Sequence, residues 1–309
     1  MKIIFAGTPA NAARTLQALL AGPHEVVAVL TRPDAPVGRK RVLTPSATAA
    51  VAEAAGIPVF KSNRVDQQLA AQLAATGAEV GVVVAYGALL KDFALEALPK
   101  GWLNLHYSLL PDWRGAAPVQ RSILAGDKVT GVTLFQLDEG MDTGPMLDTV
   151  STEIQPGESA GRLLDRLTEL GITLLDQSLP LIEAGIARFS PQSTNTQARA
   201  AAKLSREDGL IHWANPAANI ERQVLAMNPE PMAHTSIGAD SLRVLDARLA
   251  PYLESEGEPG TLIFEPKRVL VVCGTKTTLQ LLQVQPAGKN PMAAVDWARG
   301  AAGKVSRLG

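Results

Sequence analysis

The chain of 309 residues is 46% hydrophobic and 19% charged, so it can bury a sizeable core, and its length predicts two domains. Its net charge of −1 means that a polyanionic partner would have to meet local basic patches. A single cysteine excludes an intrachain disulfide, no apolar run of about 18 residues could span a membrane, and four histidines without ligand spacing predict no metal. These features favour a cytoplasmic protein.

The first half of the chain alternates predicted strands with predicted helices. Runs of branched apolar residues predict strands at 2–7, 25–31, 80–87, 103–110, 131–137 and 146–154. Helical composition predicts helices at 46–55, 65–75 and 119–125, and one or two more at 158–185. This order predicts an α/β fold with a doubly wound, mostly parallel sheet of the Rossmann-like kind.

The pattern changes after Phe189. Residues 190–204 are polar and unpatterned, which is typical of a linker. A short helix is predicted at 217–226. Four strand-like runs with turn residues between them predict a small β-barrel: 242–249, 260–265, 268–274 and 277–286. We therefore expect an α/β domain over 1–189, a linker over 190–204 and a β-rich domain over 205–309.

Two polar side chains interrupt the apolar strand that begins near Trp102. Asn104 and His106 are two residues apart, so they point to the same face of the strand. They lie toward its C-terminal end, where α/β proteins place ligands. Asp142 follows a later strand, in a stretch whose glycines allow close approach to a ligand. Singly, these residues fit a loop-bonding amide, a core histidine and an Asx turn; together they predict an acyl-transfer site.

The chemistry of this set of side chains is specific. An amide NH2 can donate to an oxyanion that develops on a carbonyl oxygen. A neutral imidazole can take a proton from an attacking amine, and a carboxylate can orient the imidazole and stabilise its cation. An amine acceptor needs no Ser or Cys nucleophile. The chain has no GxSxG elbow, and Cys273 lies in the β-rich half.

At this point a family resemblance becomes visible. Asn104-x-His106, followed by Ser108-Leu109-Leu110-Pro111 and later by Asp142, resembles the core signature of the 10-formyltetrahydrofolate-dependent formyltransferases. A longer ordered set resembles the methionyl-tRNA formyltransferases among them: IIFAGTP, TRPDAPVGRKR, VVVAYGALL, SLLPDWRGAAPVQRSILAGD, GVTLFQLDEGMDTGPML, AKLSREDGLIHW and MNPEPMA. The resemblance covers nearly the whole chain.

The resemblance implies a reaction and its residues. The formyl group on N10 of 10-formyltetrahydrofolate would pass to the α-amino group of methionine on initiator tRNA. Asn104 would stabilise the oxyanion, while His106 and Asp142 would handle protons and geometry. Which of these two takes the amine proton stays open. The folate co-substrate would be bound by Ser108, Leu109, Leu110 and Pro111.

The same resemblance implies a nucleic-acid partner. Arg39 matches a family position for tRNA contact, and Lys40 and Arg41 would add attraction for phosphates. The OB-like β-barrel would also contact tRNA. Residues 205–309 hold eleven Lys and Arg against eleven Asp and Glu, so such contact needs an asymmetric face, in which we include the tail 289–307. A monomer is expected.

Two residues depart from the pattern of the family. Tyr107 stands where relatives usually carry a small or turn-compatible residue, and its side chain should point away from His106. Packing beneath the strand must therefore differ. Glu230 replaces the tryptophan of the usual NPWP motif, and the sequence gives no physical account of that change.

Three other functions remain open at this stage. A sugar-amine formyltransferase would use the same donor and the same three side chains; the basic loop 32–41 and the β-rich domain distinguish tRNA as acceptor. A hydrolase that deformylates the cofactor would need water held near His106. A non-catalytic RNA-binding protein would not need the complete set of Asn104, His106 and Asp142.

Overall fold

The computed structural model describes residues 1–38, 40–193, 197–250 and 257–309. The chain forms two compact units that are discontinuous in sequence. The first unit comprises Met1–Pro118, Val129–Thr152 and Leu164–Ala201, and the second comprises Val119–Lys128, Glu153–Leu163 and Ala202–Gly309. The domain limits at 189 and 205 stay a prediction. None of the described helices is long and apolar enough to cross a membrane.

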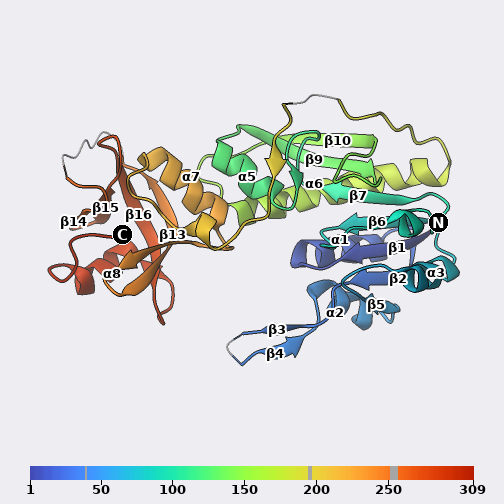
Figure 1. Ribbon diagram of the computed structural model, residues 1–309, viewed down its shortest axis with the longest axis horizontal. Coiled ribbons are helices and arrows are strands. Elements are labelled where there is room, and N and C mark those ends of the chain that lie inside the picture. Colours follow the sequence, from blue (N-terminus) through green and yellow to red (C-terminus); the bar gives the residue numbers. More distant parts are fainter. Residues whose placement is uncertain (39, 194–196, 251–256) are drawn as a thin grey trace. The chain divides into compact units, whose positions relative to one another are not determined.

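The first unit is built on a mixed sheet with the strand order β10-β9-β7-β6-β1-β2-β5 (Figure 1). The strands are β1 (Lys2–Gly7), β2 (Glu25–Thr31), β5 (Val59–Lys61), β6 (Val80–Val84), β7 (Trp102–His106), β9 (Val129–Gln136) and β10 (Met146–Glu153). The five strands from β5 to β7 run parallel, and β9 is antiparallel to β7. The predicted α/β fold with a mostly parallel sheet is confirmed.

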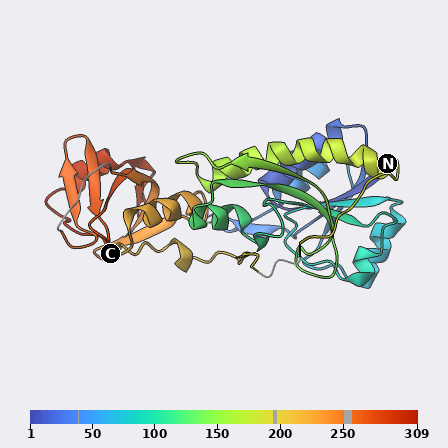
Figure 2. The ribbon, with the colours of Figure 1, turned by 90° about the horizontal axis from the view of Figure 1, so that it is seen from above.

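Helices cover both faces of this sheet, as a doubly wound fold requires. On one face, Ile4 and Trp102 pack in a buried cluster with residues of α3 (Gln67–Ala75) and α4 (Asp92–Leu95). The other face carries α1 (Ala10–Ala21) and α6 (Ala160–Glu183). Arg14 of α1 forms ion pairs with two acidic residues of α6. Figure 2 shows α6, in yellow-green, running along the sheet. Helix α2 (Ala47–Ala54) packs against α1.

The basic loop after β2 is a hairpin rather than an irregular loop. Strands β3 (Ala35–Val37) and β4 (Val42–Thr44) pair antiparallel. Its apolar side chains are largely exposed, with Leu43 68% accessible. The sequence did not predict this hairpin, because its strands have only three residues each and no buried face to impose a pattern.

The polar stretch after α6 contains ordered backbone. Strand β11 (Ala200–Ala201) pairs in parallel with β8 (Arg114–Gly115), which lies just beyond β7. The two strands are 85 residues apart or more in sequence, so no local pattern could reveal their pairing. This places part of the predicted linker beside the loop that leaves the central strand.

The second unit carries an antiparallel sheet in the order β12-β13-β16-β15-β14, with β17 beside β16 (Figure 1). Its strands are β12 (Ala233–Ile237), β13 (Asp240–Leu249), β14 (Leu262–Glu265), β15 (Arg268–Val272), β16 (Thr278–Pro286) and β17 (Met292–Ala293). The described strands do not close into a barrel, so the expected β-rich domain is present as an open sheet. Its other elements are α5 (Pro118–Ala125), η1 (Glu207–Gly209), α7 (Ala217–Met227) and α8 (Ala294–Ala301).

Candidate functional site

Strand β7 presents its two polar side chains on one face of the sheet. Leu105 packs against Gly171 of α6, and the hydroxyl of Tyr107 accepts a hydrogen bond from Asn11 of α1 at 3.0 Å. Because side chains alternate along a strand, Asn104 and His106 point to the opposite face. Burial raises the pKa of Tyr107, so this phenol stays neutral between the helices. Tyr107 therefore points away from His106, as the sequence predicted.

The loop after β9 delivers the third side chain. Asp138 accepts hydrogen bonds from the Gly140 amide at 3.1 Å and the Thr143 hydroxyl at 2.7 Å, which folds the loop back. Gly144 is required there, since a Cβ would lie 1.8 Å from the carbonyl oxygen of Gln136. Asp142 has a φ of 55°. The Asx turn belongs to Asp138, which leaves the carboxylate of Asp142 directed into the site.

The three candidate catalytic side chains converge on the carboxylate of Asp142. Its Oδ1 lies 3.5 Å from Nδ2 of Asn104, and its Oδ2 lies 3.8 Å from Nδ1 of His106. The amide of Gly115 donates to Oδ2 at 2.8 Å, which fixes the carboxylate more firmly than either side chain does. The side chains of His106 and Asp142 are only 7% and 14% exposed. Their interaction is therefore weakly screened by solvent.

A backbone carbonyl determines the tautomer of the histidine. Nε2 of His106 lies 2.9 Å from the carbonyl oxygen of Trp113. A carbonyl can only accept, so Nε2 carries the proton and donates it. In the neutral ring, Nδ1 then holds a lone pair and faces Oδ2 of Asp142. A proton arriving on Nδ1 would create a cation directly beside this carboxylate.

These side chains open into a pocket of about 510 Å³. Most of its wall is apolar and comes from Val83 of β6 and from the segments that follow β6 and β9, including Leu89, Leu90, Leu137 and Met141. Asn104, His106 and Asp142 are among the polar residues that line it. An apolar cavity with a few convergent polar groups is the usual form of a small-molecule site.

The predicted folate-binding residues continue from β7 into a turn. Ser108 is fully buried; its hydroxyl donates to the carbonyl of Asp112 at 2.7 Å, and its own carbonyl accepts from Thr133 at 2.7 Å. Leu110 is buried as well, while Leu109 and Pro111 are half-buried. None of the four is among the residues that line the pocket. Their part in folate binding stays a prediction.

Two of the three predicted tRNA-binding residues, Lys40 and Arg41, lie between β3 and β4 of the hairpin. Lys40 and Arg41 are exposed, and Arg41 has a φ of 51°. Arg39 lies outside the described residues. The side chains of Lys40 and Arg41 are therefore accessible to a large ligand.

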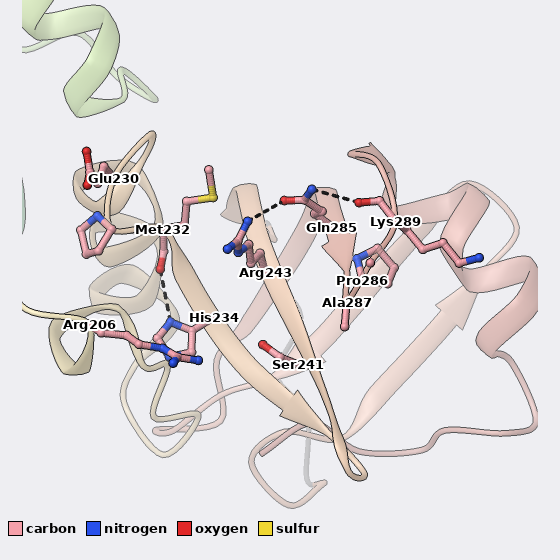
Figure 3. A pocket seen from close by; sticks show the side chains of 12 residues that line it. Arg206, Glu230, Met232, His234, Ser241, Arg243, Gln285, Pro286, Ala287 and Lys289 are labelled. Atoms are coloured by element: carbon pink, nitrogen blue, oxygen red, sulfur yellow. Dashed lines mark hydrogen bonds between the residues drawn. The ribbon is translucent and has the colours of Figure 1, made fainter. Parts of the chain in front are cut away.

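A second, basic pocket of about 600 Å³ lies in the second unit (Figure 3). Arg206, Arg243 and Lys289 line it together with His234 and with Glu230, the residue that departs from the usual NPWP motif. Arg243 donates to the side-chain oxygen of Gln285 at 3.1 Å, and the amide nitrogen of Gln285 donates to the carbonyl of Lys289 at 3.0 Å. The sequence pointed to the tail 289–307, and of that tail only Lys289 reaches this pocket.

The described residues offer little support for a metal site or for a thiol nucleophile. Within the described ranges, no group of three or more His, Cys, Asp or Glu side chains could hold a metal ion. Burial raises the pKa of Cys273 to about 12, so this thiol is neutral at physiological pH and is a poor nucleophile.

Two parts of the site escaped the sequence analysis. Residues after β6, such as Leu89 and Leu90, line the pocket; their place beyond a parallel strand was a usable signal. Gln192 was not predicted at all. It lies in the polar stretch after α6, and its amide nitrogen donates to the carbonyl oxygens of Asp142 at 2.8 Å and Gly144 at 2.9 Å.

Comparison with known families identifies the family to which the chain belongs. The family profile described as "Formyl transferase" matches residues 1–179, and the profile "Formyl transferase, C-terminal domain" matches residues 203–302. The chain belongs to the formyltransferase family. The first profile covers the strand with Asn104 and His106 and the loop with Asp142, so the resemblance noted in the sequence is confirmed at the level of the family.

Several curated proteins are similar to this formyltransferase over nearly its whole length. The methionyl-tRNA formyltransferase of Arthrobacter sp. (strain FB24) is 46% identical over 303 residues, which are 97% of each chain. The methionyl-tRNA formyltransferase of Clavibacter sepedonicus is 47% identical over 302 residues, again 97% of each chain.

Solved structures share the fold of this formyltransferase. An N-formyltransferase from Helicobacter canadensis, in complex with folinic acid and dTDP-3-aminofucose, superposes with a TM-score of 0.66 at 18% identity, covering 93% of this chain and 99% of that one. HypX from Aquifex aeolicus, in complex with tetrahydrofolic acid, gives a TM-score of 0.66 at 16% identity over 98% of this chain and 47% of that one. At these identities the likeness concerns the fold alone.

Proposed function

We propose that this formyltransferase transfers the formyl group of 10-formyltetrahydrofolate to the α-amino group of methionyl initiator tRNA, for translation initiation. The observation that carries the proposal is the 46% identity, over 97% of both chains, to a methionyl-tRNA formyltransferase. The convergence of an amide, an imidazole and a carboxylate in the lining of a mostly apolar pocket supports the formyl-transfer chemistry.

Asn104 stabilises the oxyanion in this proposal. Its NH2 group is a neutral donor on a rigid strand, and it need not reorganise as the formyl oxygen becomes negative. The contact to Asp142 at 3.5 Å is long, so the donor remains available for a stronger acceptor.

His106 takes the proton of the attacking amine at Nδ1. As the amine nitrogen bonds to the formyl carbon, its proton passes to Nδ1, and the resulting imidazolium lies 3.8 Å from Oδ2 of Asp142. The same proton can then pass to N10 as the bond between N10 and the formyl carbon breaks. The carboxylate of Asp142 stabilises this cation, and the amide of Gly115, which donates to Oδ2, holds the carboxylate in place.

The pocket fits a folate-derived donor. Its apolar wall suits a flat heterocycle, and the three catalytic side chains line the same pocket. We assign Ser108, Leu109, Leu110 and Pro111 to the turn that shapes the folate site from behind, because Ser108 and Leu110 are buried and bonded to Thr133. No metal takes part in this proposal.

Lys40 and Arg41, at the exposed turn of the hairpin, contact tRNA in this proposal, and Arg39 is a third tRNA-binding residue by its place in the sequence. Neither Lys40 nor Arg41 forms an ion pair with another residue that the structure describes, so both can neutralise phosphates. Replacing Arg41 by Ala should weaken tRNA use and reduce the dependence of binding on salt by about one phosphate contact. An unchanged salt slope would exclude a phosphate contact at this residue.

The basic pocket of the second unit is a further tRNA contact in this proposal. Arg206, Arg243 and Lys289 supply the asymmetric face that a domain of balanced charge needs in order to bind a polyanion (Figure 3). The hydrogen bonds through Gln285 link β13 and β16 to the backbone of the turn at Lys289 and orient one of the cations, the guanidinium of Arg243.

One assay with competing acceptors tests the proposal. Purified protein is mixed with 10-formyltetrahydrofolate and with either methionyl initiator tRNA or a nucleotide-linked amino sugar, and formyl incorporation is followed. We expect formylated tRNA; formylation of the sugar alone would overturn the proposal. The sugar alternative is less well supported, because the sugar-bound structure is only 18% identical to this chain.

The cellular setting follows from the substrate. Initiator tRNA is a cytoplasmic molecule in bacteria, so the proposal places the enzyme in the cytoplasm. The enzyme acts as a monomer in this proposal. Sedimentation of the purified protein at assay concentration tests the monomeric state.

A further inference from the structure

Gln192 connects the loop that carries Asp142 to the rest of the first unit. Its side chain is only 9% exposed. The amide nitrogen donates to two carbonyls of the loop, at Asp142 and Gly144, while Oε1 accepts from Nε of Arg114 at 3.1 Å and from Nη2 at 2.6 Å. Every polar atom of this buried amide is thus satisfied. One side chain joins the backbone that carries the carboxylate to the β8 residue beside Gly115.

Arg199 holds the other side of the site in the same way. Its guanidinium lies 2.9 Å from Oδ2 of Asp112 and 4.3 Å from the ring centroid of Trp113. Its own amide donates to Asp112 at 3.1 Å, and its carbonyl accepts from the amide of Trp113 at 2.6 Å. Trp113 has a φ of 62°, a conformation that needs support from its surroundings. The carbonyl of this strained residue is the one that His106 contacts.

The backbone of the same segment completes the arrangement. The carbonyl of Ala201 accepts from the amide of Ala116 at 2.8 Å, and β11 pairs with β8. Gly115, which donates to Asp142, lies within that pairing. The segment therefore touches the supports of both proton-handling groups without touching either side chain.

We propose that Gln192 and Arg199–Ala201, here called the strap, form a positioning element that sets the orientation of Asp142 and the tautomer of His106. The strap fixes the Asp142 loop through Gln192 and the Trp113 carbonyl through Arg199. This inference rests on the proposed function for its kinetic consequences, but the geometry that carries it is independent of the acceptor.

Kinetics provide the first test. Gln192→Glu keeps an acceptor for Arg114 but removes the donor to the Asp142 loop. Because displacing a catalytic group by about 1 Å can cost two orders of magnitude in rate, we expect kcat to fall by about 10- to 100-fold while KM for the folate donor changes little. Ser193→Ala, an exposed neighbour, is the matched control and should behave as the parent protein. A rise in KM at unchanged kcat would refute a positioning role.

The second test reads the histidine directly. With ¹⁵N-labelled histidine, the parent protein should show His106 protonated at Nε2, and His106→Gln identifies its signals. Arg199→Ala should move these signals toward a mixture of tautomers and alter the acidic limb of the pH–rate profile. Arg199→Lys keeps the charge beside Asp112, so its histidine signals and its pH–rate profile should be close to those of the parent protein. Unchanged signals in Arg199→Ala would overturn the proposal. Should Arg199→Ala fail to fold, Arg199→Gln, which removes the charge but keeps much of the side chain, decides through the same signals: a shift toward mixed tautomers supports the proposal, and unchanged signals overturn it.

The two readouts separate the strap from the proposed function. If the protein formylates no methionyl-tRNA but the His106 signals still respond to Arg199, the strap stands and the assigned acceptor falls. If tRNA is formylated and the signals do not respond, the strap alone is wrong.

Discussion

The pocket around His106 and the pocket around Arg243 hold their polar groups in opposite ways. In the first, a few polar side chains stand against an apolar wall, and each is bonded to backbone or to a neighbour. In the second, several exposed cations share one hollow with a single carboxylate, Glu230. Catalysis needs polar groups that are held in fixed positions and shielded from solvent, whereas attraction of a polyanion needs accessible charge.

This difference follows from the cost of burial. A buried polar group without a partner is unfavourable by about 1–3 kcal/mol, so the buried groups that orient this site are bonded to backbone or to neighbouring side chains. Rigidity is the result, and it favours catalysis. Exposed cations carry no such penalty and can adapt to phosphates, but each contributes little and is weakened by salt. Changes in the first pocket should therefore be large and specific, and changes in the second small and salt-dependent.

The largest effect is expected at the catalytic side chains. Asn104→Ala should lower kcat by about 100-fold or more through loss of the oxyanion donor, and His106→Ala should do so through loss of the base. Single-turnover formylation measures the loss, and the circular dichroism spectrum checks the fold. His212→Ala, an exposed histidine of the second unit, is the control. Rates near those of the parent protein would show that these side chains do not perform the chemistry.

A smaller but substantial effect is expected at Gly115. Its φ is 123°, and a Cβ there would lie 2.6 Å from the carbonyl oxygen of Ala201. Gly115→Ala should part β8 from β11, shift the amide that donates to Asp142, and lower kcat by about tenfold or more. Gly300→Ala, where a Cβ meets no atom, is the control for adding a methyl group. If Gly115→Ala retains full activity, the backbone amide does not position the carboxylate.

The basic pocket should respond more modestly. Arg243→Ala should weaken tRNA binding severalfold and reduce the slope of log affinity against log salt by about one. Filter binding over a range of salt concentrations measures both quantities. Lys267→Ala removes an exposed cation of the same unit that does not line the pocket, and it should leave the slope unchanged. Equal slopes for all three proteins would remove this pocket from the tRNA surface.

The smallest effect is expected at Glu230. This carboxylate lies in the pocket with Arg206, Arg243 and Lys289, where it opposes an incoming phosphate (Figure 3). Glu230→Gln should therefore strengthen tRNA binding by a few-fold at low salt, with a gain that fades as salt screens the charge. Weaker binding by Glu230→Gln would mean that the carboxylate helps to bind tRNA instead.

Much of the fold was accessible from the sequence because its signals are local. Branched apolar runs identified six of the seven strands of the main sheet, and the spacing of Asn104 and His106 placed both on one face. The missed elements lack such signals: β5 and the hairpin strands have three residues each, and α8 lies in a tail that we predicted only as a basic patch. β7 ended at His106 rather than at 110, because the turn at Ser108 bonds to Thr133 instead.

The sequence by itself determined the identity of the site: which residue types are present, at what spacing, and on which strand ends. Tertiary structure alone decided how they act. The tautomer of His106 depends on a carbonyl seven residues away, and the orientation of Asp142 depends on Gln192, fifty residues further along the chain. Apolar periodicity records which face of an element is buried, but it carries no information about which distant backbone group a side chain will meet.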